Sequence, residues 1–392
     1  MDRADVVIVG GGVMGSAIAW SLVTDPGFGG SVVVAERDPT YQRASSALSA
    51  SSIRQQFTTP ENIRMSQFGI EVLRDIGEIL RVDDEIPDVG LVERGYLYLV
   101  PESGVDVFRA ANAVQRAEGA DVVLLTPAEL AARYPWLSMD GVALGSLGRT
   151  GEGWFDGYGL LRAYRRAAAA RGAIYRVAEV VGLRRRGDRL VAVELAGGAV
   201  IETGTVVNAA GPWAAEVAAM AGIELPVRAQ RRTVFRFDSP VAIDAAPLVI
   251  DASGAWFRPE GGGFIGAIAP APEDDRPDLP LEVDRALWEA ALWPALANRV
   301  PAWDELRLTG AWAGYYETNT FDHNAILGPH PEIENLLFAN GFSGHGIQGA
   351  PAVGRAIAEQ VIHGRYVTLD LSVFAFERIA AGRRVEERNV IG

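Results

Sequence analysis

The N-terminal segment 4–37 restricts the possible folds more than any other part of the chain. Residues 4–10 form a continuous run rich in β-branched side chains, which is typical of a parallel strand buried on both faces. Residues 11–23 follow with helical spacing, and residues 31–37 form a second apolar run. Strand, glycine turn, helix and strand make a βαβ unit, which predicts an α/β domain with a parallel sheet.

The turn of this unit carries Gly10, Gly12 and Gly15 in the spacing GxGxxG. The first glycine allows the tight bend, the second lets the backbone approach a pyrophosphate, and the third lets helix pack on strand. The free N–H groups of the helix then favour an anion. Glu36 ends the second strand, where its carboxylate would bind both ribose hydroxyls and repel a 2′-phosphate. The pattern predicts a dinucleotide site.

Composition excludes several classes of protein. The 392 residues predict two domains or one large one, and the net charge of −14 argues against a nucleic-acid partner. All 36 basic residues are arginine, which excludes Schiff-base chemistry on lysine, and cysteine is absent. The four histidines lack metal-binding spacing, so we expect no metal. Residues 6–22 are too short and glycine-rich for a membrane span, and we expect a cytoplasmic protein without membrane association.

Later segments indicate that the first domain is interrupted. A β-meander is expected over 173–211, and the tail 336–364 again reads as strand, glycine turn and helix. Alternating patterns elsewhere predict antiparallel strands, and helices are expected at 61–80, 126–135, 159–173 and 285–296. We therefore predict a discontinuous dinucleotide-binding domain (1–75, 151–222 and 322–392) and an interleaved domain with a mainly antiparallel sheet and flanking helices (76–150 and 223–321).

Five segments together resemble the D-amino-acid oxidase superfamily of FAD enzymes, in its glycine oxidase, sarcosine oxidase and dimethylglycine dehydrogenase branch. They are GGGVMGSAIAW near the N-terminus, VVNAAGPWA (206–214), WAGYYE (312–317), DHNAILG (322–328) and GFSGHGIQGAP (341–351). The resemblance spans the chain in the right order. It implies a Rossmann-type FAD-binding domain and a substrate domain, and it favours FAD over a nicotinamide cofactor, the alternative that the glycine turn leaves open.

The resemblance also implies which residues surround the cofactor. Serines of the segment 44–57 would line it rather than form a linker, and the helix after GFSGHG would point its positive end at the flavin N1 and O2 atoms. The implied FAD contacts are Gly10, Gly12, Val13, Met14, Gly15, Glu36, Arg37, Ser45, Ser46, Ser49, Ser51, Ser52, Val180, Ala209, Ala210, Gly211, Trp213, Gly344, His345, Gly346, Ile347 and Gln348.

The sequence departs from the superfamily pattern at three places. Ser49 stands about where covalent members carry a histidine, and cysteine is absent, so we predict non-covalent FAD. The lysine associated with oxygen reactivity is missing, with Phe264 in its expected place, which makes a fast oxidase less expected. Tyr316 stands where glycine oxidase-like proteins have an arginine that holds the substrate carboxylate.

The remaining candidates for catalysis are Arg54, Arg258, Tyr316 and His345. Either arginine would suit a bidentate contact with a carboxylate, or each is a solvated or interdomain ion pair. Tyr316 and the neighbouring Glu317 would bind a substrate amine, or they only pack. His345 would contact the flavin, or it is a turn histidine bound to the backbone.

The resemblance implies an FAD-dependent oxidoreductase that oxidises the C–N bond of a small amine or amino acid. Glycine, N-methylated glycines and D-amino acids are the expected types, with hydride transfer to flavin N5 and an imine that hydrolyses. The electron acceptor is oxygen, a quinone or a partner protein. Two alternatives stay open: an FAD-dependent 2-hydroxy acid dehydrogenase, and a flavoprotein for assembly or electron transfer with weak catalysis.

Overall fold

The computed structural model describes residues 2–243 and 245–387, and its first sheet is largely parallel. The strand order is β17-β18-β11-β1-β2-β8, with all neighbouring pairs parallel except β17 with β18. The meander strands β9 and β10 pair antiparallel beside β11. The bounds are β1 Arg3–Val9, β2 Val32–Glu36, β8 Ile174–Val177, β9 Val180–Arg186, β10 Arg189–Leu195, β11 Val200–Asn208, β17 Ile326–Pro329 and β18 Leu336–Asn340.

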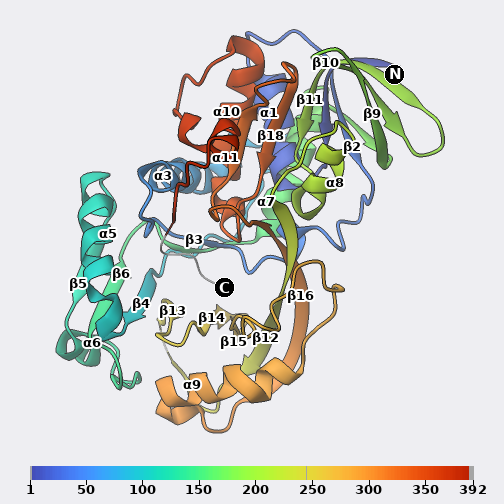
Figure 1. Cartoon of the computed structure of the whole chain (residues 1–392). Helices are drawn as coiled ribbons and strands as arrows, with labels where there is room; N and C mark the ends of the chain where they lie inside the picture. Colours follow the sequence, from blue (N-terminus) through green and yellow to red (C-terminus); the bar gives the residue numbers. More distant parts are fainter. Residues whose placement is uncertain (1, 244, 388–392) are drawn as a thin grey trace.

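Both faces of this sheet are covered, which explains the unbroken apolar run at 4–10. Val6 and Ile8 pack into the core under the helices, whereas Val7 and Val9 pack against the meander and α8. Figure 1 shows α1 and α10 side by side over the sheet. The helices on that face are α1 (Val13–Thr24), α3 (Pro60–Arg74), α7 (Gly157–Ala170) and α10 (Gly346–His363), and α8 (Ala214–Ala219) lies on the other.

The second sheet is antiparallel apart from one parallel pair, β13 with β4. Its order is β16-β12-β15-β14-β13-β4-β6-β5, and the helix α9 (Trp293–Arg299) lies at the base of this domain in Figure 1. The bounds are β4 Tyr96–Val100, β5 Val122–Leu125, β6 Leu144–Gly148, β12 Val227–Asp238, β13 Leu248–Ile250, β14 Trp256–Glu260, β15 Gly263–Ala267 and β16 Arg307–Asn319; α5 (Val105–Ala117) and α6 (Pro127–Arg133) flank it.

The predicted α/β fold with a parallel sheet and a second, mainly antiparallel domain is confirmed. The strands of the first sheet all fall within 1–75, 151–222 and 322–392, and those of the second within 76–150 and 223–321. The two long strands β12 and β16 lead from one part of the molecule to the other (Figure 1). A short pair, β3 (Ser52–Ile53) with β7 (Gly153–Trp154), forms a separate two-stranded sheet.

Three local predictions were wrong in detail. The meander was expected to start at 173, but β8 pairs parallel with β2, so only β9 to β11 form the meander. The helix expected over 61–80 is two helices that meet at Asp75, namely α3 and α4 (Ile76–Ile79). The helix expected over 285–296 contains a π-helical turn, Trp288–Leu292, directly before α9, and Pro294 near the start of α9 lacks the N–H that a regular helix needs.

Within residues 2–243 and 245–387, no helix combines the length and apolar character that crossing a membrane requires.

Candidate functional site

A cavity of about 610 Å³ runs from the glycine turn after β1 to the second sheet. Its walls come from segments far apart in the chain: the β1–α1 turn, the serine-rich segment, 209–217 after β11, the facing strands β12 and β16, and 342–348 before α10. Carboxyl ends of parallel strands form one rim, which is where open α/β sheets bind ligands.

The glycine turn has the geometry of a pyrophosphate cradle. Gly10 has a φ of +100°, and a Cβ there would lie 2.4 Å from the carbonyl oxygen of Ala209, so only glycine fits. Glu36 receives one backbone N–H on each carboxylate oxygen, from Gly11 and from Asp38, both at 2.8 Å. Each oxygen keeps a further acceptor position, and Glu36 lines the cavity. This arrangement suits a ribose diol.

The serine-rich segment lies along the cavity rather than acting as a linker. It contains the short helix α2 (Ser45–Leu48), and Ser46 Oγ accepts the N–H of Val13 at 3.4 Å. The indole N–H of Trp312 donates to the Leu48 carbonyl at 2.8 Å and holds the end of α2 against β16. The segment lines the cavity with Ser45, Ser46, Ser49, Ser51 and Ser52.

At the far end of the glycine turn, two arginines flank one tryptophan. Trp213 ends the 3₁₀ turn Gly211–Trp213, and the guanidinium carbon of Arg37 lies 4.0 Å from its ring centroid. That of Arg43 lies at 5.3 Å. These groups give this end of the cavity a positive, flat wall of the kind that cation–π contacts stabilise. The predicted residues Val180, Ala209 and Ala210 line the same end.

The loop before α10 brings His345 to the cavity. Desolvation by burial lowers the pKa of His345 to about 4, so its imidazole is neutral near pH 7. Within the described part of the chain, its buried Nε2 atom has no hydrogen-bond partner. Helix α10 begins at Gly346, so its N-terminus opens on the cavity, with Gly344, Ile347 and Gln348 also in the wall.

Tyr316 lies directly against this loop. A Cβ at Gly344 would fall 2.4 Å from Cε2 of Tyr316, and the φ of Gly344 is +92°, so glycine is required here. Tyr316 lines the cavity together with its neighbours on β16, Gly314, Tyr315 and Glu317. Burial raises the pKa of its phenol, so Tyr316 presents a neutral hydroxyl group to the cavity and not a phenolate.

Glu317 also lines the cavity, and desolvation raises its pKa to about 8. The carboxyl group accepts the N–H of Gly341 at 3.3 Å. At neutral pH it is therefore mainly protonated, which makes it a poor partner for a substrate ammonium and a suitable hydrogen-bond donor. Glu152, buried under the Arg54 loop, has its pKa raised to about 7 for the same reason.

This raised pKa predicts a pH-dependent stability. A carboxyl whose folded-state pKa exceeds its unfolded value of 4.5 binds more protons when folded, so stability falls as pH rises from 4.5 to about 8. Glu152 contributes mainly below pH 7, so the change between pH 7 and 9 reports Glu317. We expect urea unfolding of the wild type to show lower stability at pH 9 than at pH 7. Glu317→Gln should flatten this difference; an unchanged difference would contradict the assignment.

Arg54 is brought into the cavity by contacts with α10 and its own loop. Its backbone N–H donates to Oε1 of Gln348 at 2.8 Å, and its Nη1 donates to the Gln56 carbonyl at 2.6 Å. The guanidinium carbon lies 3.9 Å from the Phe57 ring centroid. Below this loop, Glu152 accepts hydrogen bonds from the Gln55 N–H and the Gln56 amide. Arg54 is thus a fixed cation at the end of the cavity that meets the second sheet.

Three sequence-predicted residues lie outside the wall of the cavity. Gly15 packs α1 on β1, since a Cβ there would lie 1.9 Å from the Gly10 carbonyl. Arg258 forms an ion pair with Glu260 and donates to the Ala50 carbonyl at 2.7 Å, so it holds the serine-rich segment instead of facing a substrate. Phe264 packs in the aromatic core on the opposite face of its sheet, against Phe237 and Trp303.

Sequence reasoning missed the wall contributed by the second sheet. Along these strands, residues that face the cavity alternate with residues that face the core. This alternation predicts that the sheet has two faces, but it does not tell which face meets a ligand. The missed lining residues of this wall are Tyr96, Arg232, Val234, Leu248, Trp256, Ala267 and Ile268. At the other end, Asp38, Tyr41 and Arg43 follow Glu36 closely and were also missed.

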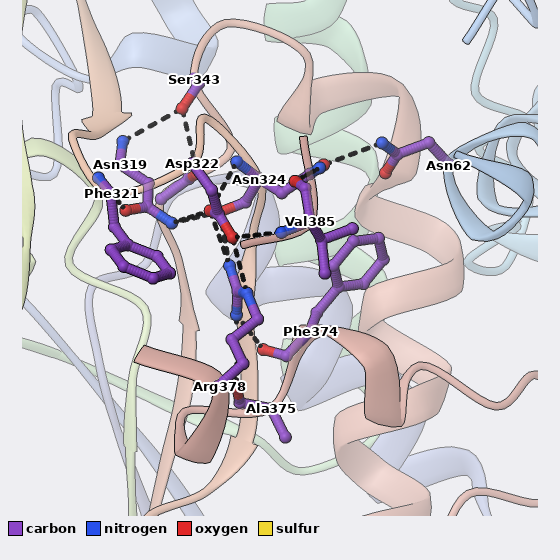
Figure 2. Close-up of polar contacts among 11 residues, drawn as sticks. Asn62, Asn319, Phe321, Asp322, Asn324, Ser343, Phe374, Ala375, Arg378 and Val385 are labelled. Atoms are coloured by element: carbon purple, nitrogen blue, oxygen red, sulfur yellow. Dashed lines mark hydrogen bonds and ion pairs between the residues drawn. The ribbon is translucent and has the colours of Figure 1, made fainter. Parts of the chain in front are cut away.

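The DHNAILG segment (322–328) does not line the cavity. It lies behind the loop that carries His345. Figure 2 shows Asp322 between the guanidinium of Arg378 and the side chain of Asn319. Asn319 N donates to Ser343 Oγ at 3.0 Å, which connects this network to the loop that carries His345. Asn324 receives the amide of Asn62 from α3 at 2.8 Å. The motif therefore fixes the loop from the outside.

The residues present fit an FAD molecule. Three features face the same cavity. They are the close approach of backbone at the glycine turn, the carboxylate of Glu36, and the loop in which His345 Nε2 is buried without a hydrogen-bond partner among the described residues. These residues would hold the pyrophosphate, the ribose and the flavin edge respectively.

Comparison with known proteins agrees with this geometry. The family model described as DAO, FAD dependent oxidoreductase, matches residues 5–360. A "FAD-dependent oxidoreductase domain-containing protein 1" of Xenopus laevis is 43% identical over 100% of this chain and 85% of its own. Two crystal structures are similar: L-proline dehydrogenase from P. horikoshii (TM-score 0.83, 28% identity, 98% of this chain and 100% of that one) and glycine oxidase from Geobacillus kaustophilus (TM-score 0.81, 26% identity, 96% and 98%).

Proposed function

Because this chain belongs to the DAO family of FAD-dependent oxidoreductases, we propose that it oxidises the C–N bond of a small amine or amino acid. Glycine, N-methylated glycines and D-amino acids are the substrate types in this proposal, and the FAD is held without a covalent link. Similarity to glycine oxidase and L-proline dehydrogenase, which are named for amino acids, supports the substrate class.

The observation that carries this proposal is the continuity of the cavity. The same space that is lined by the dinucleotide cradle reaches Arg54, Tyr96, Tyr316 and the apolar residues of the second sheet. A small molecule bound there would lie between the loop of His345 and the strands β12 and β16.

FAD, when bound, supplies an acceptor for two electrons. The side chains around the substrate end favour the neutral form of an amine, which is the form that gives up a hydride. Arg54 places positive charge in a poorly solvated space, and this lowers the pKa of a nearby amine. The carboxyl of Glu317, with its pKa near 8, offers little opposing negative charge at pH 7. Helix α10 directs its positive end into the cavity.

Non-covalent attachment makes a direct prediction. Ser49 lines the cavity where covalent superfamily members are expected to carry histidine, and the chain has no cysteine. Precipitating the purified yellow protein with acid should therefore leave all flavin in the supernatant. A yellow pellet after acid treatment would contradict this part of the proposal.

The experiment that tests the activity is anaerobic reduction of the bound flavin. We expect bleaching of the flavin absorbance by at least one of a panel of amines and amino acids, and none by 2-hydroxy acids. Bleaching by hydroxy acids alone would indicate a hydroxy-acid dehydrogenase. If the whole panel fails, an assembly or electron-transfer role is favoured. Reoxidation by oxygen, compared with a quinone, then identifies the acceptor class.

A further inference from the structure

Arg232 is a second arginine at the substrate end of the cavity. It lies on β12, where it is opposite Gly314 and two positions from Gln230, the residue opposite Tyr316. Its residue exposure is 8%, and it shares the cavity-facing side of β12 with Val234. The guanidinium carbon lies 5.4 Å from the centroid of the Tyr316 ring. A buried arginine here needs an anion nearby.

The structure supplies that anion from a loop. Nη1 and Nη2 of Arg232 donate to the two carboxylate oxygens of Asp275 at 2.7 and 2.9 Å. Asp275 belongs to the loop 268–284, which joins β15 to the following helical turn. The first residues of that loop, Ile268 and Ala269, line the cavity. Two parallel N–H···O bonds are the geometry in which arginine recognises any planar carboxylate.

The loop is held at other points as well. The Asp278 N–H donates to the Ala229 carbonyl at 2.7 Å, and the Tyr315 hydroxyl donates to the Leu279 carbonyl at 2.7 Å. Asp275 can therefore leave Arg232 without detaching the whole loop. Both arginines also have a backbone partner: Arg54 donates to the Gln56 carbonyl and lies over the Phe57 ring, and Arg232 Nη1 donates to the Arg231 carbonyl at 2.8 Å.

We propose that Arg232 binds the carboxylate of the substrate, and that Asp275 occupies the same guanidinium edge until the substrate displaces it. The inference rests on the proposed function and narrows its substrate to an amino acid rather than a simple amine. The cavity wall on this side is apolar, with Val234, Leu248, Trp256 and Ala267. We therefore expect the part of the substrate beyond its carboxylate to be small and apolar. Asp275 thereby reduces the affinity for carboxylates by competition.

Two substitutions separate this role from a purely structural ion pair. Both Arg232→Met and Asp275→Asn remove the ion pair, so a structural role predicts that both change ligand binding in the same direction. The proposal predicts opposite directions, because the first removes the anion-binding group and the second removes its competitor. The probes are pyrrole-2-carboxylate, 2-furoate and benzoate, with pyrrole-2-carboxamide as the neutral control, and the readout is the Kd from perturbation of the flavin spectrum of the holoprotein.

We expect Arg232→Met to weaken carboxylate binding at least about tenfold, as loss of a charge-assisted bidentate contact implies. Asp275→Asn should tighten it several-fold, and neither should change carboxamide binding. Weaker binding in both variants, or no carboxylate binding by the wild type, overturns the inference. If Arg232→Met does not fold, Asp275→Asn decides alone by the sign of its effect. A colourless protein would instead refute FAD binding, so the two failures are distinguishable.

Discussion

Replacing Gly12 with glutamate is expected to give a folded protein that no longer binds FAD. Gly12 lines the cavity at the start of α1, and a Cβ there would meet only Ser46 Oγ, at 3.5 Å. A longer side chain therefore extends into the cavity instead of into the protein. The carboxylate would both occupy the place of the pyrophosphate and repel it, and a like-charge contact of this kind costs several kcal/mol, a loss of affinity of about 100-fold or more.

The measurement is the ratio of flavin absorbance to protein absorbance after purification, followed by titration with FAD. Gly12→Ala is the matched control, because its methyl group makes an ordinary contact and should keep most of the FAD. Circular dichroism of Gly12→Glu should match that of the apoprotein. A fully yellow Gly12→Glu protein would show that the glycine turn does not hold the pyrophosphate.

Replacing Asp322 with alanine is expected to cause a large loss of stability. Asp322 is 3% exposed and Arg378 is 4% exposed, and they are joined by two hydrogen bonds of 2.9 and 3.0 Å (Figure 2). The carboxylate also accepts hydrogen bonds from Asn319, Asn324 and Val385. Removing one member leaves a buried charge without its counterion, which costs about 3–5 kcal/mol.

Urea or thermal unfolding of the holoprotein measures this loss, and the melting temperature should fall by roughly 5 °C. The matched control is Asp238→Ala, which removes the exposed ion pair with Arg307 and should cost less than about 1 kcal/mol. The double variant Asp322→Leu with Arg378→Met should lose less than either single change, since neither charge then lacks its partner. A similar small loss for Asp322→Ala and Asp238→Ala would refute the importance of the buried network.

The network also bears on the cavity. Asn319 and Ser343 connect Asp322 to the loop that presents His345, so Asp322→Ala should release FAD at lower urea concentrations than those that unfold the protein. The C-terminal segment thus stabilises the site although Arg378 and Val385 do not line the cavity.

The parts of the site that could be predicted from the sequence are local. Gly10, Gly12 and Glu36 lie within one βαβ unit, and the conformational demands of its turn leave few alternatives to glycine. Resemblance extended the prediction to Ala209–Gly211 and Gly344–Gln348, which all line the cavity. In both cases the prediction depends on how closely the backbone can approach the cavity, and less on the chemistry of the side chains.

The parts that could not be predicted depend on which face of a strand meets the cavity. Phe264 and Ile265 are neighbours on β15, yet the first packs in the aromatic core and the second on the cavity side. A shift of one residue exchanges the two faces, and an apolar sequence such as GFIGA fits either. For Arg258 the sequence left a substrate contact and an ion pair open, and in the structure Glu260 and the Ala50 carbonyl bind its guanidinium.

By itself, the sequence determined a chain built around a glycine turn, a ribose-binding carboxylate and two further glycine-lined crossings, because backbone geometry is encoded by neighbouring residues. Only the tertiary structure decided which charged side chains line the cavity. Arg54, Arg232 and Glu317 come from separate segments, and their charge states and partners depend on burial and on contacts with residues far away in the chain.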